Sequence, residues 1–176
     1  MELYLCEFDP QFTQKQISGI TYALLRRIFS ERFSLPAPEI LRAENGKPYF
    51  EGLPCHFSIS HSGNMALIGI SDSEIGVDIQ LHSGSKQHPR LFSDKMLEEF
   101  GYYDGWVLRE SVFKLCGNGS LRNMEFSRAN GHIISPFDNV ACRLYHIRDG
   151  VSIAVASYSD NFPDKIINIR EIANCS

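Results

Sequence analysis

Long hydrophobic runs are absent from this sequence of 176 residues. The longest apolar stretch, residues 65–70, has the length of a strand and falls far short of the ~18 residues of a membrane span. The first seven residues lack the basic and apolar regions of a secretory signal. We therefore expect a cytoplasmic protein with no membrane partner.

Cysteine is also scarce, and the sequence contains no C-x-x-C pair. The cysteines are widely scattered and odd in number: Cys6, Cys55, Cys116, Cys142 and Cys175. Disulfide frameworks and zinc sites need clustered cysteines, so this spacing argues against both. We expect these side chains to be small apolar fillers in a reducing compartment.

Neither sign of charge is in large excess. Seventeen Lys and Arg against 21 Asp and Glu give a net charge of −4, which does not suit binding of nucleic acid by bulk charge. The composition is 43% hydrophobic and 11% aromatic, unlike that of disordered chains. A chain of this length can bury one sizeable core.

Local patterns predict a strand and then a helix at the start of the chain. Residues 2–8 alternate as a strand does, and Thr13-Gln14-Lys15-Gln16 has the form of a capping box. Apolar residues follow at helical spacing, which predicts an amphipathic helix of about five turns. These residues are Ile17, Ile20, Leu24 and Ile28.

Two later pairs of apolar segments are typical of hairpins. Residues 65–70 and 75–79 are separated by a short polar turn. Residues 140–147 and 151–158 flank the dipeptide Asp149-Gly150, which is a strong hairpin signal.

Helical segments are predicted between these hairpins, at residues 93–100 and 105–116. Each half of the chain therefore offers a helix and a hairpin. We predict an α+β fold of two pseudo-symmetric halves, each a helix packed on a small antiparallel sheet. The halves are residues 1–81 and 90–176, with a loop at 82–86 between them.

Two polar stretches stand out in the first half as candidates for chemistry. Lys47 lies on the turn 46–48, where a solvated lysine is the ordinary interpretation. The stretch 57–63 brings serine hydroxyls, His61 and a glycine together, and such groups can hold phosphate oxygens. The serines can equally satisfy their own backbone.

Two carboxylates are the next candidates. Asp78 lies within a short apolar strand, so it needs a cation, a metal or several N–H groups unless it lies at a surface edge. Glu110 and Lys114 are four residues apart on a predicted helix, where an ordinary ion pair is one interpretation. Asp78 and Glu110 together would instead supply two hard oxygen ligands that suit Mg²⁺.

Taken together and in this order, these stretches resemble the 4'-phosphopantetheinyl transferases, in particular the single-chain pseudo-dimeric type. The family pattern is a G-K-P turn, an S-H-S segment, a G-[VI]-D-[IV]-E strand and then a tryptophan shortly before [KR]-E-[AS]-x-x-K. The matching stretches here are Gly46–Pro48, Ser60–Ser62, Gly76–Gln80 and Trp106–Lys114. The resemblance covers residues 40–120 well and the ends loosely.

The resemblance implies a transfer reaction with coenzyme A as substrate. Such enzymes move the 4'-phosphopantetheine arm of coenzyme A to a serine of an apo acyl, peptidyl or polyketide carrier protein, and release adenosine 3',5'-bisphosphate. It also implies an active site in the cleft between the halves, so that a monomer suffices. The carrier and its pathway stay open.

The resemblance further assigns a role to each matching residue. The implied Mg²⁺ ligands are Asp78, Glu110 and, at the position of the family's second acid, Gln80. The implied catalytic residues are Glu110 as base, Lys114 and His61. The implied coenzyme A contacts are Lys47, Pro48, Ser60, His61 and Lys114, together with Arg26 or Arg27 at the 3'-phosphate, of which we name Arg26.

Three departures from the family pattern bear on these expectations. Gln80 supplies an amide oxygen without charge, so we expect a weaker metal site that needs more Mg²⁺. The connection between Gln80 and Trp106 is shorter than usual, which puts the carrier-docking surface in doubt. Arg109 replaces the more usual lysine and keeps the charge, which we expect to be a small change.

Two other hypotheses stay open. A degenerate family member would bind coenzyme A or a carrier protein without transfer, and Gln80 and the short chain favour this. An unrelated small α+β binding module would match the motifs by chance. The joint presence of Asp78, Glu110 and Lys114 favours the active transferase.

Overall fold

The computed structural model describes residues 1–82, 88–117 and 121–169. The helices are α1 (Gln14–Phe33), α2 (Asp94–Cys116) and the short 3-10 turns η1 (Pro89–Leu91) and η2 (Leu121–Asn123). The strands are β1 (Glu2–Glu7), β2 (Ile40–Arg42), β3 (Pro48–Phe50), β4 (His56–Ser62), β5 (Met65–Ser71), β6 (Ile75–Leu81), β7 (Ser127–Ala129), β8 (His132–Ile134), β9 (Ala141–Tyr145), β10 (Val151–Ser157) and β11 (Ile167–Ile169). Among these described residues, no helix is long and apolar enough to cross a membrane.

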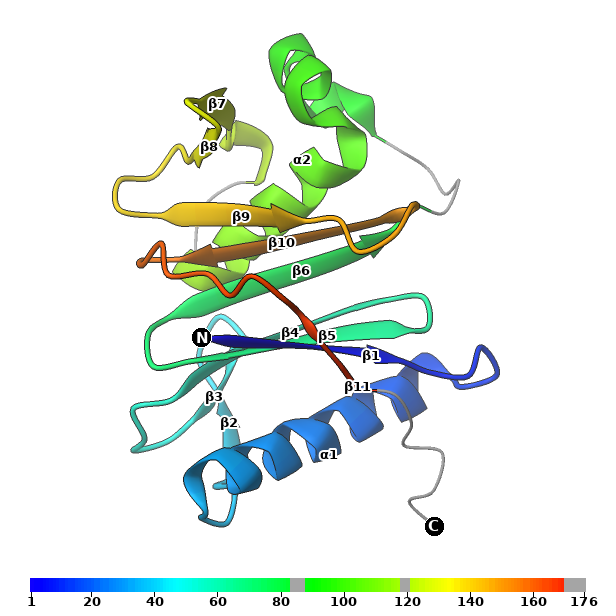
Figure 1. Ribbon diagram of the computed structural model, residues 1–176, viewed down its shortest axis with the longest axis vertical. Helices are drawn as coiled ribbons and strands as arrows, with labels where there is room; N and C mark the ends of the chain where they lie inside the picture. The colour runs from blue at the N-terminus through cyan, green and yellow to red at the C-terminus, as the bar shows by residue number, and fades with distance from the viewer. Residues whose placement is uncertain (83–87, 118–120, 170–176) are drawn as a thin grey trace.

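The elements stack in four layers, with two sheets between two helices (Figure 1). The first sheet has the strand order β11-β1-β5-β4 and the second the order β6-β10-β9. Ile68 of β5 packs toward α1 and Leu67 toward the second sheet, while Val155 of β10 packs toward the first sheet and Ala154 toward α2. Both central strands are therefore buried on two faces.

The same topology occurs twice along the chain, which confirms the α+β prediction of a helix on a small antiparallel sheet, except that β11 adds a parallel strand beside β1 in the first sheet. In the first unit, β1 is followed by α1, the small hairpin β2–β3, and then β4 and β5 in the order β1-β5-β4. In the second, β6 is followed by α2, the hairpin β7–β8, and then β9 and β10 in the order β6-β10-β9.

The pairing of β6 places the start of the second unit earlier than the sequence division does. β6 lies within residues 1–81, yet it pairs antiparallel with β10. The division into 1–81 and 90–176 as domains stays a prediction. Most of the predicted loop 82–86 lies outside the described residues, because the description stops at residue 82 and resumes at 88.

The predicted hairpin of residues 65–70 and 75–79 is wrong. Both strands exist at the expected places, but β5 pairs with β1 and β4 while β6 joins the other sheet. The turn between them therefore carries the chain from one sheet to the next. The second hairpin is confirmed, with β9 and β10 paired antiparallel so that Tyr145 lies opposite Ile153.

The helix predictions are confirmed with one difference. Thr13 and Gln16 form the capping box at the start of α1. The two predicted helical segments of the second half form a single element, α2, interrupted at Gly101, whose φ of 68° and ψ of −177° are not helical. This positive φ suits a residue without a Cβ, so the glycine marks the kink.

The edges of the two sheets meet through serine side chains rather than through a backbone ladder. Three alternate residues of β4 point at β6. The hydroxyl of Ser58 accepts from the backbone N–H of Val77 at 3.1 Å, and that of Ser62 accepts from the N–H of Leu81 at 2.9 Å. Between them, the Ser60 hydroxyl donates to the carboxylate of Asp78. We call Ser58, Ser60 and Ser62 the serine ladder.

The second sheet also approaches α2 very closely at Gly76. A Cβ at this position would lie 1.9 Å from the carbonyl oxygen of Ser111 and 2.6 Å from the backbone nitrogen of Leu115. Helix backbone cannot move aside as a flexible side chain can. Gly76 therefore sets the short spacing between β6 and α2, two residues before Asp78.

We predict that Gly76→Ala destabilises the protein by on the order of 2 kcal/mol, because the added methyl group pushes α2 away from β6. The matched control is Gly19→Ala on the exposed face of α1, where a Cβ meets nothing within 4 Å. That change should stabilise the protein by about 0.5–1 kcal/mol through helix propensity. Urea unfolding of both variants measures the difference, and equal stability would contradict the close-packing argument.

Candidate functional site

Asp78 is the centre of the candidate site. Its position on β6 turns the side chain toward α2, and the residue is buried. One carboxylate oxygen, Oδ1, accepts from Ser60 Oγ at 2.6 Å and from Lys114 Nζ at 2.7 Å. The expectation that a buried carboxylate here needs a cation or N–H groups is thus confirmed. Burial raises the pKa of Asp78, and Lys114 and Ser60 oppose this rise.

Glu110 lies next to this pair, on the same side of α2 as Lys114. Burial raises the pKa of Glu110, the nearby charge of Asp78 raises it further, and Lys114 lowers it. Among the described residues, no side chain forms a hydrogen bond or ion pair with the Glu110 carboxylate. The structure therefore brings together three predicted residues from β6 and α2, and leaves one of the two carboxylates without a partner.

Gln80 lies two residues beyond Asp78 on β6, and therefore on the same face of the strand. Its amide nitrogen donates to the carbonyl of Leu81 at 3.0 Å. No group of three or more His, Cys, Asp or Glu side chains suited to a metal occurs in the part of the chain that is described. Any metal here would thus rely on two carboxylates, the Gln80 amide oxygen and ligands from substrate or water.

His61 lies on the opposite face of β4 from the serine ladder. Its Nε2 is 3.2 Å from the hydroxyl of Thr21 on α1. Because Thr21 gives its proton to the carbonyl of Ile17 at 2.7 Å, the imidazole must be the donor in this contact. Burial lowers the pKa of His61, and the charge of Lys114 lowers it further.

Lys47 is held away from the two carboxylates by a third acid. Its ammonium lies 2.6 Å from Glu74, and the same carboxylate is 3.2 Å from Nδ1 of His56. Lys47 and Pro48 also line a cavity of about 220 Å³, and Lys114 lines the same cavity. The lysines of the G-K-P turn and of α2 therefore face one space, which extends from the site toward the β2–β3 hairpin.

Arg26 and Arg27 are both exposed on α1. Arg27 forms an ion pair with Glu31 at 2.7 Å. Arg26 follows Tyr22 by one helical turn, and the Tyr22 hydroxyl contacts Arg42 of β2. The Arg26 side of α1 is thus the side that faces the small hairpin of the first unit.

Arg109 is not the small change that the sequence suggested. Its side chain is 1% exposed, and it donates to the carbonyls of Met124 at 2.7 Å and Leu91 at 2.6 Å and to Glu125 at 3.0 Å. The guanidinium also lies 4.1 Å from the ring centre of Phe92. A lysine at this position has one nitrogen and cannot make these divergent contacts.

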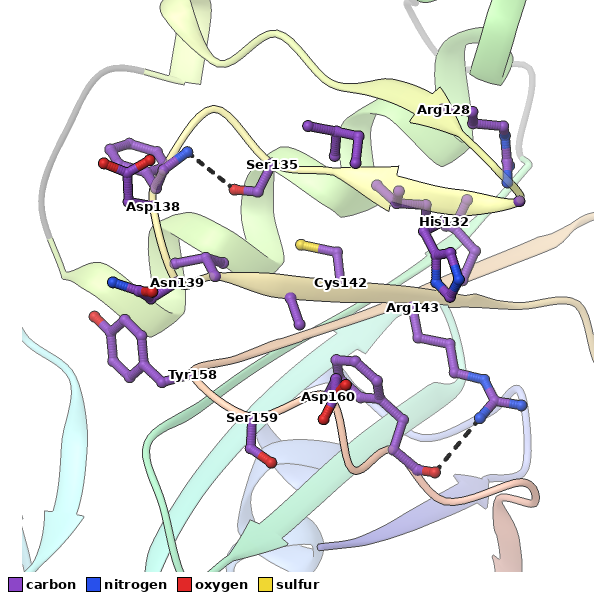
Figure 2. Close-up of a pocket in the computed structure, with 18 of the residues that line it drawn as sticks. Arg128, His132, Ser135, Asp138, Asn139, Cys142, Arg143, Tyr158, Ser159 and Asp160 are labelled. Carbon is purple, nitrogen blue, oxygen red and sulfur yellow. Dashed lines mark hydrogen bonds between the residues drawn. The ribbon is translucent and has the colours of Figure 1, made fainter.

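A second, larger cavity lies in the other unit and holds none of the predicted site residues (Figure 2). It has a volume of about 1220 Å³ and lies beside the hairpin β7–β8, strand β9 and residues 158–162. Two of its basic side chains are engaged elsewhere: Arg143 contacts Asp164, and His146 contacts Asp104. We therefore assign the site to the Asp78 region despite the smaller space there.

The sequence interpretation missed several partners that shape this site. Thr21 and Glu74 hold His61 and Lys47, and neither lies in a recognisable motif. Ser58 and Ser62 join the two units, and their alternation with Ser60 along β4 is a signal that the sequence did contain.

The fold and the site define an α+β protein of two repeated units, with two carboxylates and a lysine at their junction. No protein-family model matches the chain. It is 31% identical to the 4'-phosphopantetheinyl transferase of Bacillus subtilis, over 70% of this chain and 64% of that protein. It is 28% identical to the 4'-phosphopantetheinyl transferase psf-1 of Bacillus pumilus, over 54% and 48% respectively. A shorter match, 40% identical over 33% of the chain, is to the 4'-phosphopantetheinyl transferase AcpT of Salmonella typhi and spans 31% of that protein.

These matches support assignment of the chain to the 4'-phosphopantetheinyl transferase superfamily. They agree with the resemblance of the four motifs, but they do not establish the single-chain pseudo-dimeric subtype. The matches to the two Bacillus proteins span between about half and two thirds of those proteins' own length.

The raised pKa of Glu110 predicts a pH-dependent effect of Glu110→Gln on stability. At neutral pH the folded protein carries a disfavoured charge that glutamine removes, so the variant should be more stable than the wild type. As the pH falls through the raised pKa toward the ordinary value of 4.5, folded Glu110 takes up a proton and this advantage should shrink. Urea unfolding of the variant and the wild type at a series of pH values measures the difference in stability. A variant that is less stable than the wild type at neutral pH would contradict the prediction.

Proposed function

We propose that this chain transfers the 4'-phosphopantetheine arm of coenzyme A to a serine of an apo acyl, peptidyl or polyketide carrier protein. The observation that carries the proposal is the meeting of Asp78, Glu110 and Lys114 at the junction of the two units. Membership of the superfamily gives this cluster its chemical interpretation. One chain supplies both sides of the site, so the proposal needs no second copy.

The proposed step is a phosphoryl transfer. The serine oxygen of the carrier bonds to the phosphorus that bears the pantetheine arm, and the bond from that phosphorus to the bridging oxygen breaks. Adenosine 3',5'-bisphosphate leaves with the bridging oxygen, and the serine proton goes to a base. Positioning and neutralisation of charge provide most of the catalysis in such reactions.

Asp78 and Glu110, with Gln80 as a neutral oxygen donor, would hold Mg²⁺. When bound, the ion would neutralise charge on the diphosphate of coenzyme A. The chemistry of the donors fits this ion, because all three offer hard oxygens and Glu110 has no partner among the described side chains.

The remaining roles follow from position. Glu110 is the base that accepts the serine proton, directly or through water, and its raised pKa makes its carboxylate a better acceptor. Lys114 meets the charge that develops on the bridging oxygen. Lys47 and Pro48 border the cavity that would receive the nucleotide end, with Arg26 at the 3'-phosphate.

Ser60 and His61 require a change on binding if they contact phosphates. The Ser60 proton is directed at Asp78 and the Nε2–H of His61 at Thr21. A phosphate oxygen near His61 would favour the protonated imidazole, which donates from both nitrogens. His61 would then hold one phosphate oxygen while keeping its contact with α1.

The alternative function is a degenerate member that binds coenzyme A or a carrier protein without transfer. The neutral Gln80 favours it, since the metal would lose one charged ligand. Incubation with coenzyme A, Mg²⁺ and a panel of apo carrier proteins separates the two functions. Mass spectrometry should find one phosphopantetheine added per carrier; coenzyme A binding without transfer to any carrier would favour the alternative.

Glu110→Gln should reduce the transfer rate by at least about 100-fold, because the base and one metal ligand are lost together. The matched control is Glu98→Gln, an exposed position on the same helix, which should retain the wild-type rate. Circular dichroism checks that both variants fold. A folded Glu110→Gln variant with full activity would remove Glu110 from the mechanism.

Gln80→Glu should lower the Mg²⁺ concentration that gives half-maximal transfer, because a charged oxygen replaces a neutral one beside the other ligands. Gln11→Glu adds the same charge at an exposed position distant in sequence from residue 80, and should leave the Mg²⁺ concentration for half-maximal transfer unchanged. An equal requirement in Gln80→Glu and wild type would mean that position 80 does not face the metal.

A further inference from the structure

Lys114 is paired with Asp78, one of the two carboxylates proposed to hold the metal. Its ammonium lies 2.7 Å from Oδ1, and Ser60 donates to this atom as well. The carboxylate is 7% exposed and the lysine side chain 27% exposed, so the pair is sheltered from solvent. A buried carboxylate in this setting depends on its one cationic partner.

A divalent cation and an ammonium group cannot share this carboxylate at little cost, because two positive charges would lie within a few ångströms of each other. Binding of a metal to either oxygen of Asp78 is therefore opposed for as long as Lys114 stays in place. The displaced ammonium would also leave the carbonyl of Val77, to which it donates at 3.2 Å. These lost contacts oppose metal binding when no other partner for the lysine is present.

An anion beside the site changes this balance. Lysine carries its charge on a flexible four-carbon stem, and Lys114 borders the cavity that also contains Lys47. A phosphate in that space would pair with the ammonium and remove it from Asp78. The metal would then meet a carboxylate without a counter-ion, next to the unpartnered Glu110.

We propose that Lys114 is a resident counter-ion of Asp78 that keeps the metal affinity low until a phosphate-bearing ligand draws its ammonium away. The inference rests on the proposed function for the identity of that ligand, coenzyme A. Binding free energies are reciprocal, so the metal must strengthen coenzyme A binding by the same factor. The site is thus built to hold metal and diphosphate together and to bind either one weakly.

Mn²⁺ is a suitable probe, because electron paramagnetic resonance measures its free concentration without any turnover. In the absence of coenzyme A, Lys114→Gln should bind Mn²⁺ at least about tenfold more tightly than the wild type. Glutamine keeps an N–H donor for Asp78 and removes the charge. The matched control is Lys47→Gln, which breaks the comparable ion pair with Glu74 and should leave Mn²⁺ affinity unchanged. The inference is overturned if Lys114→Gln folds and binds Mn²⁺ no more tightly than wild type.

A measurement on the wild type keeps the test valid if Lys114→Gln does not fold. Acetylation by an N-hydroxysuccinimide ester, mapped by mass spectrometry, reports how far the Lys114 amine is engaged, with exposed Lys15 as internal reference. Saturating Mn²⁺ should raise the modification of Lys114 relative to Lys15. An unchanged ratio at saturation would show that the metal does not displace Lys114, and would overturn the inference.

The transfer assay separates this inference from the proposed function. If Lys114→Gln binds Mn²⁺ more tightly and the wild type transfers to no carrier, the counter-ion role is supported and the enzyme activity is contradicted. If the wild type transfers and Lys114→Gln binds Mn²⁺ no more tightly than it does, the enzyme activity is supported and the counter-ion role is contradicted.

Discussion

A carboxylate buried where two sheet edges meet is the constraint on which this structure depends. Asp78 cannot stay ionised there without partners, and each partner comes from a different element: Ser60 from β4 and Lys114 from α2. The first unit, the second sheet and the second helix are therefore tied to one side chain. Gly76 allows this arrangement, because any larger residue would hold α2 away from β6.

The two units share a topology, but the cavities beside their small hairpins are completed by different segments. Each unit has a cavity beside its small hairpin and the strand that follows it, β4 in the first and β9 in the second. In the first unit Lys114 and Phe113 of the neighbouring α2 complete the lining, whereas residues 158–162 complete it in the second. The first cavity thus differs in that the other unit contributes a charged side chain, Lys114, to its lining.

Local patterns were sufficient to predict both long helices, several of the longer strands and the candidate residues that meet at Asp78, because capping residues, turn dipeptides and a buried acid act over a few positions. Thr13, Asp149-Gly150 and Asp78 are examples. The pairing of β5 and β6 was not predictable in this way. Both strands are apolar on two faces, so their sequences do not say which sheet each joins. Glu74 and Thr21 were missed because only the folded chain brings them to Lys47 and His61.

The serine ladder gives the junction between the units its own spectroscopic signature. Hydroxyl groups, not carbonyls of a continuous sheet, receive the amide protons of Val77 and Leu81. Separation of the two units would expose these two amides to solvent exchange while the pairing of β6 with β10 stays intact. Their exchange rates consequently report the contact between β4 and β6 separately from the unfolding of either sheet.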